Sequence, residues 1–204
     1  MDEWHKAQMY EKDWWGSCQN TLGEDIKQMA LAPYMGLKIV PDVKTPYRIP
    51  LNGQSVLDIG GGCSSLLLKC ENVDGTVVDP CDFPEWVYDR YIYAGIDYMI
   101  CKGEDLPTEM EYDEVWIYNC LQHTEDPHEI IRIARKISKI IRFFEWINIP
   151  VCEGHLHCFT SQQLEEWLGG TGKVVKLNSN GLHGEALTGI FLGDHYDTKA
   201  EKEV

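Results

Sequence analysis

The chain has 204 residues, of which 44% are hydrophobic, and this is the size of one globular domain with a full core. Its formal net charge of −15 and its pI of about 4.8, without a dense cluster of Lys and Arg, argue against a nucleic-acid-binding protein. No apolar run reaches the length of a membrane span, and no signal peptide precedes the eight cysteines, so we expect free thiols in a reducing compartment. The composition predicts a soluble, cytoplasmic protein and leaves its oligomeric state open.

The first fifty residues show no strand pattern. Residues 3–35 are rich in Trp, Met, Lys and Glu, which predicts two or three short helices, and three prolines make residues 40–50 an extended connector. We therefore expect a helical cap and connector over residues 1–50, a main domain over residues 51–195 and a C-terminal tail over residues 196–204. All three would belong to one structural domain.

A glycine-rich turn follows the first strand pattern, in residues 56–65, VLDIGGGCSS. Val56, Leu57 and Ile59 predict a strand that is buried on both faces, and three glycines come directly after it. The serines and leucines that follow predict a helix, whose first turn would present unpaired backbone N–H groups and the positive end of a helix dipole. Such a loop holds a polar or anionic small molecule.

A carboxylate ends the next predicted strand. In the run TVVDP, Asp79 stands twenty-one positions after Asp58, and Pro80 follows it. A carboxylate at this place can accept hydrogen bonds from the two vicinal hydroxyls of a ribose. The turn and the acid together predict a nucleoside cofactor.

On these residues the chain resembles the class I S-adenosylmethionine-dependent methyltransferases of the small-molecule type. The first motif of that family is an acid, a gap and two glycines spaced one apart, which here are Asp58, Gly60 and Gly62, while Ser64 stands where a third glycine is often found. The NAD-binding fingerprint G-x-G-x-x-G needs no such acid and puts Ser65 at its last position, so it fits less well. The resemblance implies S-adenosylmethionine as cofactor and S-adenosylhomocysteine as product.

The resemblance also implies the fold and the cofactor contacts. The fold is α/β, a doubly wound, mostly parallel seven-stranded sheet of the Rossmann-like methyltransferase type, with residues 51–195 as the cofactor-binding domain. In the segment KGEDLP the usual aspartate of the family falls on Lys102, so that Gly103 would supply backbone contacts and either Glu104 or Asp105 would replace the acid. The implied cofactor-binding residues are Asp58, Gly60, Gly61, Gly62, Asp79, Pro80, Gly103, Glu104, Asp105, Asn119 and Cys120.

A helix start follows the strand predicted over residues 114–119. Asp126 is a suitable N-cap, Pro127 suits the first turn, and Glu129 can reach back to the cap. The predicted apolar face of this helix consists of Ile130, Ile133, Ala134, Ile137 and Ile141, and the basic residues Lys136, Lys139 and Arg142 would form its solvated side.

The loop before this helix must open at the carboxyl edge of the sheet, beside the glycine turn. Its string LQHTEDP looks like the fourth-motif region of small-molecule methyltransferases. His123 is the candidate general base, because the pKa of a histidine lies near operating pH. The alternative is a histidine that bonds a backbone carbonyl and holds the loop.

The remaining predictions concern the acceptor side and the end of the sheet. His155 and His157 follow the strand predicted over residues 142–150, and either line the substrate pocket or pack against the protein; with nothing else to complete a site, no metal is expected. Trp14 and Trp15 in the cap either form part of the pocket wall or fill the core. The last two strands, joined by a hairpin loop at residues 181–184, would add one antiparallel edge strand.

Motifs that are absent from the fourth-motif region limit the class of methyl acceptor. It has no N/D-P-P-Y/F string of amino-methylating DNA enzymes and no Pro-Cys pair, since Asn119, Cys120 and Leu121 stand there. The resemblance therefore implies methyl transfer to an O or N atom of a small molecule, sugar or short peptide. The alternatives are a nicotinamide-dependent oxidoreductase and a non-catalytic module that binds the cofactor or a partner.

Overall fold

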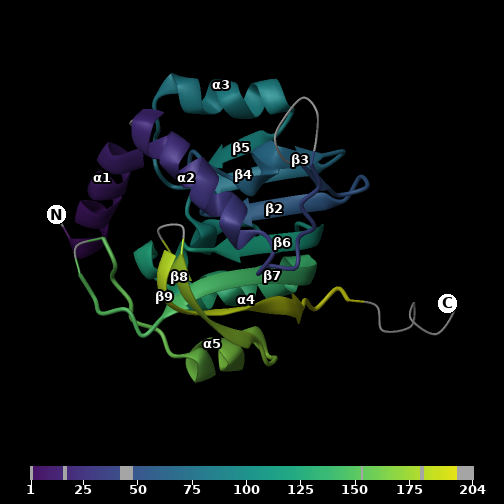
Figure 1. Ribbon diagram of the computed structural model, residues 1–204. Helices are drawn as coiled ribbons and strands as arrows, with labels where there is room; N and C mark the ends of the chain where they lie inside the picture. Colours follow the sequence, from purple (N-terminus) through teal and green to yellow (C-terminus); the bar gives the residue numbers. More distant parts are fainter. Residues whose placement is uncertain (1, 16–17, 42–47, 153, 180–181, 197–204) are drawn as a thin grey trace, which may run out of the picture.

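A seven-stranded sheet forms the centre of the molecule (Figure 1). The computed structural model describes residues 2–15, 18–41, 48–152, 154–179 and 182–196. The strands of the described chain are β1 (Ile49–Pro50), β2 (Ser55–Ile59), β3 (Cys70–Glu71), β4 (Asp74–Asp79), β5 (Asp97–Ile100), β6 (Tyr112–Tyr118), β7 (Ser138–Ile147), β8 (Lys173–Ser179) and β9 (Leu182–Leu192). The helices are α1 (Glu3–Trp15), α2 (Cys18–Leu31), α3 (Glu85–Ala94), α4 (Pro127–Ile137) and α5 (Ser161–Leu168), with 3₁₀ turns η1 (Leu66–Lys69), η2 (Gly103–Asp105) and η3 (Leu121–His123).

The strand order is β5-β4-β2-β6-β7-β9-β8, and β1 pairs with β3 in a separate small sheet. Strands β4, β2, β6 and β7 pair in parallel, whereas β9 runs antiparallel to both β7 and β8. This confirms the predicted α/β fold and the mostly parallel seven-stranded sheet. The antiparallel strand is not at the edge, however: β9 lies between β7 and β8, because a tight hairpin makes β8 and β9 neighbours and β9 then pairs with β7.

The hairpin is also tighter than predicted. Residues 182–184 of the expected loop belong to strand β9, where Gly184 is opposite Leu177. Residue 181 lies outside the described residues, as does residue 180.

Helices cover both faces of the sheet, and the alternation of apolar side chains along the strands divides the core in two. Val56, Trp116 and Phe144 face α2 and α3 in one cluster. Leu57 and Val115 face α4 and α5 in the other. Strands that are buried on both faces explain the continuous apolar runs of the sequence.

Helix α4 ends earlier than the periodicity of its isoleucines predicts. Asp126 caps its first turn by accepting a hydrogen bond from the Glu129 amide at 3.0 Å, as expected. At the other end strand β7 begins directly at Ser138, whose hydroxyl donates to the Ala134 carbonyl at 2.7 Å. Ile141 is therefore a strand residue, because pairing of this β-branched and aromatic segment with β6 outweighs its helical spacing.

The basic residues expected on the solvated side of this helix are divided by the same boundary. Lys139 lies on β7, where its Nζ is 2.6 Å from a carboxylate oxygen of Asp113. Arg142 forms an ion pair with the buried carboxylate of Glu114 at 2.6 Å. Neither a single helical face nor a basic patch results.

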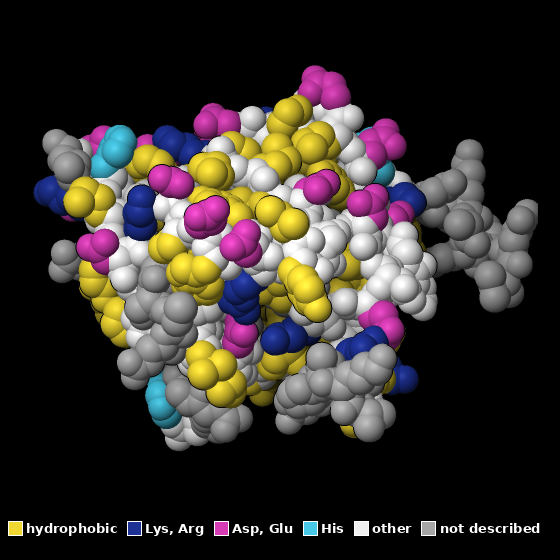
Figure 2. All heavy atoms as spheres, turned by 90° about the horizontal axis from the view of Figure 1, so that it is seen from above, with side chains coloured by type: hydrophobic (Ala, Val, Ile, Leu, Met, Phe, Trp, Pro, Cys, Tyr) yellow, Lys and Arg dark blue, Asp and Glu magenta, His cyan; other side chains and the backbone are white. Residues whose placement is uncertain are grey.

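Among the helices of the described chain, none combines the length and the hydrophobicity that crossing a membrane requires. The face of the molecule seen in Figure 2 carries acidic side chains spread among hydrophobic ones, in keeping with the net charge of −15. Figure 1 shows helix α1 beside one end of the sheet, next to the turns that follow β4 and β6. That end carries a cavity.

Candidate cofactor and acceptor site

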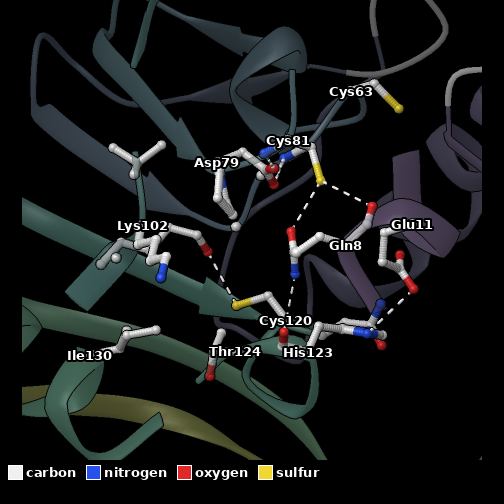
Figure 3. A pocket seen from close by; sticks show the side chains of 18 of the residues that line it. Gln8, Glu11, Cys63, Asp79, Cys81, Lys102, Cys120, His123, Thr124 and Ile130 are labelled. Atoms are coloured by element: carbon white, nitrogen blue, oxygen red, sulfur yellow. Dashed lines mark hydrogen bonds and ion pairs between the residues drawn. The ribbon is translucent and has the colours of Figure 1, made fainter. Parts of the chain in front are cut away.

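A cavity with about 850 Å³ of empty space lies at the carboxyl ends of β2, β4 and β6 (Figure 3). This is the place where open α/β sheets bind ligands. The glycine turn, the loops after β4, β5 and β6, and helices α1 and α2 form its wall. The segments that the sequence singles out are thus brought together.

The glycines of the turn after β2 differ in what surrounds them. A Cβ on Gly60 would lie 2.5 Å from the Cβ of Cys120, and one on Gly61 would lie 2.7 Å from a carboxylate oxygen of Asp58. Gly62 has a φ of +54°, and the nearest atom to a Cβ there would be the Asp79 carboxylate at 3.7 Å. The first two glycines are required by packing, whereas a side chain on Gly62 would project beside Asp79 into the cavity.

The expected helix after the turn is a single 3₁₀ turn, η1, which is capped by Ser65. The amide of Ser65 donates to the Tyr91 hydroxyl at 3.1 Å, and the amide of Leu66 donates to the Tyr118 hydroxyl at 2.9 Å. The prediction that a helix N-terminus with unpaired amides faces the ligand is therefore wrong. Two buried tyrosines from α3 and β6 satisfy these amides, which sequence spacing alone did not reveal.

Asp58 lies beneath the turn rather than in the cavity wall. Its side chain is fully buried and accepts hydrogen bonds from the hydroxyls of Ser65 and Tyr118, the latter at 2.9 Å. Burial raises the pKa of Asp58 to about 7. Instead of reaching the cavity, this carboxyl group holds the turn in place.

Asp79 lies in the cavity wall, next to Pro80. Its carboxylate accepts hydrogen bonds from the Gly62 amide at 3.1 Å and from the Cys81 amide at 2.9 Å. Burial raises the pKa of Asp79 to about 6, although the hydrogen bonds from Cys81 and Gly62 oppose this shift. The carboxylate is thus ionised and held in one orientation at neutral pH.

The loop after β5 also reaches the cavity, through Lys102, Gly103 and Glu104. Asp105 is exposed and does not line it, so the geometry favours Glu104 among the two acids left open by the sequence. Glu104 accepts hydrogen bonds from the amides of Glu125 and Asp126, each at 3.0 Å, which ties the loop to the start of α4.

Gly103 is a glycine because two side chains approach it closely. A Cβ there would lie 2.9 Å from Ile59 and 3.1 Å from Ile130. Lys102 extends beside it, with its Nζ 2.8 Å from Glu125 and 4.0 Å from the centre of the Trp4 ring.

Asn119 and Cys120, which the resemblance implies as cofactor-binding residues, follow β6 and line the cavity. Asn119 has a positive φ of +53°, and its side-chain oxygen accepts from the Trp146 indole at 2.7 Å. The amides of Cys120 and Leu121 donate to one carboxylate oxygen of Glu145, at 3.0 and 2.7 Å. Glu145 is a buried positioning residue of strand β7 that the sequence analysis missed.

The surroundings of His123 bear on both roles considered for it, general base and support of its loop. Its Nδ1 is 2.6 Å from the Gly154 carbonyl and 3.4 Å from the Glu11 carboxylate, so Nδ1 carries the proton and Nε2 is left as the acceptor. Burial lowers the pKa of His123 to about 4, which leaves the imidazole neutral at physiological pH. The histidine holds its loop and also lines the cavity.

A second cavity, with about 1000 Å³ of empty space, adjoins the first, and Glu11, Asn119 and His123 line both. Trp14 and His155 line it, whereas His157 lines neither cavity and bonds the Thr124 carbonyl through Nε2 at 2.8 Å. The side chain of Trp15 lies outside the described part of the structure.

Helix α1 contributes residues that the sequence analysis did not assign. Trp4, Gln8 and Glu11 line the main cavity, and the side chain of Gln8 bonds the His123 carbonyl at 3.2 Å and the Cys81 thiol at 3.2 Å (Figure 3). Their spacing of four and three residues puts them on one helical face, which is the signal that could have identified them.

Among the described residues, no three His, Cys, Asp or Glu side chains are arranged to hold a metal ion. Free thiols are found at Cys70, Cys81, Cys101, Cys120 and Cys158.

No protein-family model matches the chain, and no curated protein matches its sequence. Solved structures match it in fold. A chain of the Haloferax volcanii complex that contains the methyltransferase activator Trm112 has a TM-score of 0.65 and 14% identity, over 91% of this chain and 98% of that one. The N-methyltransferase NodS from Bradyrhizobium japonicum matches with a TM-score of 0.60 and 12% identity, over 93% of this chain and 100% of that one.

The magnesium protoporphyrin IX methyltransferase ChlM from Synechocystis gives a TM-score of 0.59 and 12% identity, over 95% of this chain and 98% of that one. Other matching proteins are longer, and this chain spans 53% of the length of one of them. At these identities the likeness is one of fold, and it agrees with the predicted Rossmann-like methyltransferase architecture.

Proposed function

We propose that the chain is an S-adenosylmethionine-dependent methyltransferase that acts on an O or N atom of a small molecule, sugar or short peptide. One observation carries this proposal: among the described residues, the cavity presents a buried carboxylate, Asp79, beside a glycine turn whose following amides are already bonded. The amides of Ser65 and Leu66, which a pyrophosphate would need, are bound to tyrosine hydroxyls. A nucleoside cofactor without phosphates suits this wall.

Two features of the cavity fit that cofactor. The space beside Asp79 that a Cβ on Gly62 would enter suits the hydroxyls of a ribose, which donate to the carboxylate. The side-chain oxygen of Gln28 is buried in the same wall without a hydrogen-bond partner among the described residues, and it can accept from the ammonium of the amino-acid end. Gly103 and Glu104 are then left for the adenine.

The sheet itself argues against a nicotinamide-dependent oxidoreductase. Dinucleotide-binding sheets have the order 3-2-1-4-5-6 with parallel strands, and the pyrophosphate rests on the helix after the first strand. Here an antiparallel strand, β9, is inserted next to β7, and the element after β2 is the one-turn η1.

When bound, S-adenosylmethionine supplies a methyl carbon on a positively charged sulfur, and transfer to a lone pair of the acceptor leaves the sulfur neutral with the electrons of the broken bond. The chain contributes mainly position: Glu145 holds the backbone of Cys120 and Leu121, and Gln8 holds the carbonyl of His123. The pKa of His123 is about 4 and not near the operating pH, as the sequence analysis expected, so its Nε2 is a weak base that holds the proton of the acceptor only in passing to solvent.

The test is calorimetric titration of the purified protein with S-adenosylmethionine, S-adenosylhomocysteine and NADH in parallel. We expect both sulfur nucleosides to bind and NADH not to bind. Binding of NADH alone would favour the oxidoreductase, and failure of all three ligands to bind would favour the non-catalytic, partner-binding module.

A further inference from the structure

The second cavity continues the first at the point where the cofactor ends and the acceptor must begin. Glu11, Asn119 and His123 stand at the junction, since they line both cavities. The remaining wall comes from helices α1 and α2, from strands β7 and β9 and from the loops after β6 and β7, and most of its side chains are aromatic, charged or imidazole. Its charge and its aromatic surface limit what the acceptor can be.

The charge of this wall is negative. Among its described residues Lys27 is the one Lys or Arg, and its Nζ lies 3.2 Å from the Glu24 carboxylate, with which it forms an ion pair. His123 is neutral because burial lowers its pKa, so it does not offset the charge of Glu11. The one cation that a carboxylate or phosphate acceptor would meet among the described residues of this wall is Lys27, which is already paired with Glu24. An ammonium ion would meet the carboxylate of Glu11.

The aromatic part of the wall suits the same cation. The rings of Tyr10 and Trp14 lie one helical turn apart on α1, nearly parallel, with their centres 6.5 Å apart and 13° between their planes. Trp146 lines the same cavity from strand β7, where its indole N–H donates to Asn119 at 2.7 Å. Aromatic faces attract cations and accommodate other aromatic rings.

We infer that the methyl acceptor is an aromatic amine that enters as a cation, with its ammonium group against the Glu11 carboxylate, beside the imidazole of His123, and its ring among Tyr10, Trp14 and Trp146. This inference rests on the proposed function and deepens it. Figure 3 shows Glu11 directed at His123 from helix α1. The ammonium first loses one proton to solvent, the lone pair of its nitrogen then forms the bond to the methyl carbon as the carbon–sulfur bond breaks, and the product leaves as the methylated ammonium.

The experiment is calorimetric titration of the protein saturated with S-adenosylhomocysteine, using four probes of similar size: 2-phenylethylamine, tryptamine, 2-phenylethanol and 3-phenylpropanoate. The variants are Glu11→Gln, which removes the charge at the junction, and Asp13→Asn, which removes an exposed charge from the same helix away from both cavities. We expect both amines to bind at least about tenfold more tightly than the alcohol and the acid, and Glu11→Gln to remove about tenfold of that affinity. Asp13→Asn should leave it unchanged.

Failure of this inference is distinct from failure of the proposed function. If S-adenosylhomocysteine does not bind in the first titration, the function is wrong and the inference falls with it. If it binds but the acid or the alcohol binds as well as the amines, or no probe binds, the inference alone is overturned. It is likewise overturned if Glu11→Gln leaves amine binding intact and weakens S-adenosylmethionine relative to S-adenosylhomocysteine, because Glu11 would then serve the sulfonium.

Discussion

Replacing Asp79 by Asn tests the cofactor site most directly. The asparagine keeps one acceptor oxygen for the Cys81 amide but loses the charge and one of the two carboxylate oxygens. Hydrogen bonds to a charged group contribute about 1.5–3 kcal/mol and neutral ones about 1 kcal/mol, so we expect binding of S-adenosylhomocysteine to weaken by about 1–3 kcal/mol, or roughly 5- to 150-fold. The matched control is Asp82→Asn, an exposed carboxylate three residues further along the same loop.

The pH dependence sharpens this test. Burial raises the pKa of Asp79 to about 6, and ribose hydroxyls donate more strongly to the ionised carboxylate than to the neutral acid, so affinity is highest above pH 6 and falls below it. At pH 5 only about one molecule in ten carries the charge before binding, so the wild-type affinity should fall about tenfold and approach that of the variant. Glu145 also has a raised pKa, but it titrates in both proteins, and the pKa of Asp58 is raised chiefly by its burial, which the substitution leaves in place.

The assay is isothermal titration calorimetry of both variants and the wild type between pH 5 and pH 8, with urea denaturation to confirm that each variant is folded. An unchanged dissociation constant for Asp79→Asn at pH 8 would refute the ribose assignment. An equal loss in Asp82→Asn would show that the effect is one of general charge rather than of a contact.

Four further substitutions separate catalysis, binding and stability. His123→Ala should slow turnover about a hundredfold while S-adenosylhomocysteine binds normally, and a wild-type rate in steady-state assays would contradict its role as proton acceptor. Gly62→Ala should cost about 1–2 kcal/mol of folding free energy through its positive φ and also weaken cofactor binding, whereas Gly60→Ala should lose more stability in urea because its Cβ meets Cys120. Glu145→Gln should destabilise the protein by about 1–3 kcal/mol, since an amide cannot accept from all three backbone N–H groups around it; equal urea midpoints would refute this.

Much of the fold could be predicted from local patterns. Runs such as Val56 to Ile59 are buried on both faces of a parallel sheet, so they carry a continuous apolar signal, and Asp126 with Pro127 marks a helix start by its own chemistry. The end of α4 could not be predicted in this way, because the isoleucine spacing continues past Ile137 while pairing with β6 converts the next residue into a strand. The place of β9 inside the sheet was likewise decided by pairing between distant strands.

In the candidate site, too, some features follow from local sequence and others only from tertiary packing. The sequence by itself determined which turn and which acid meet at the carboxyl edge of the sheet, because a strand, a glycine turn and Asp79 at the end of the next strand follow from neighbouring residues. Only the tertiary structure decided that Asp58 lies under the turn, that tyrosine hydroxyls occupy the amides of Ser65 and Leu66, and that Glu11 on helix α1 faces His123. These contacts join residues far apart in the chain, so they are set by how the helical cap and the sheet pack together, which no local spacing records.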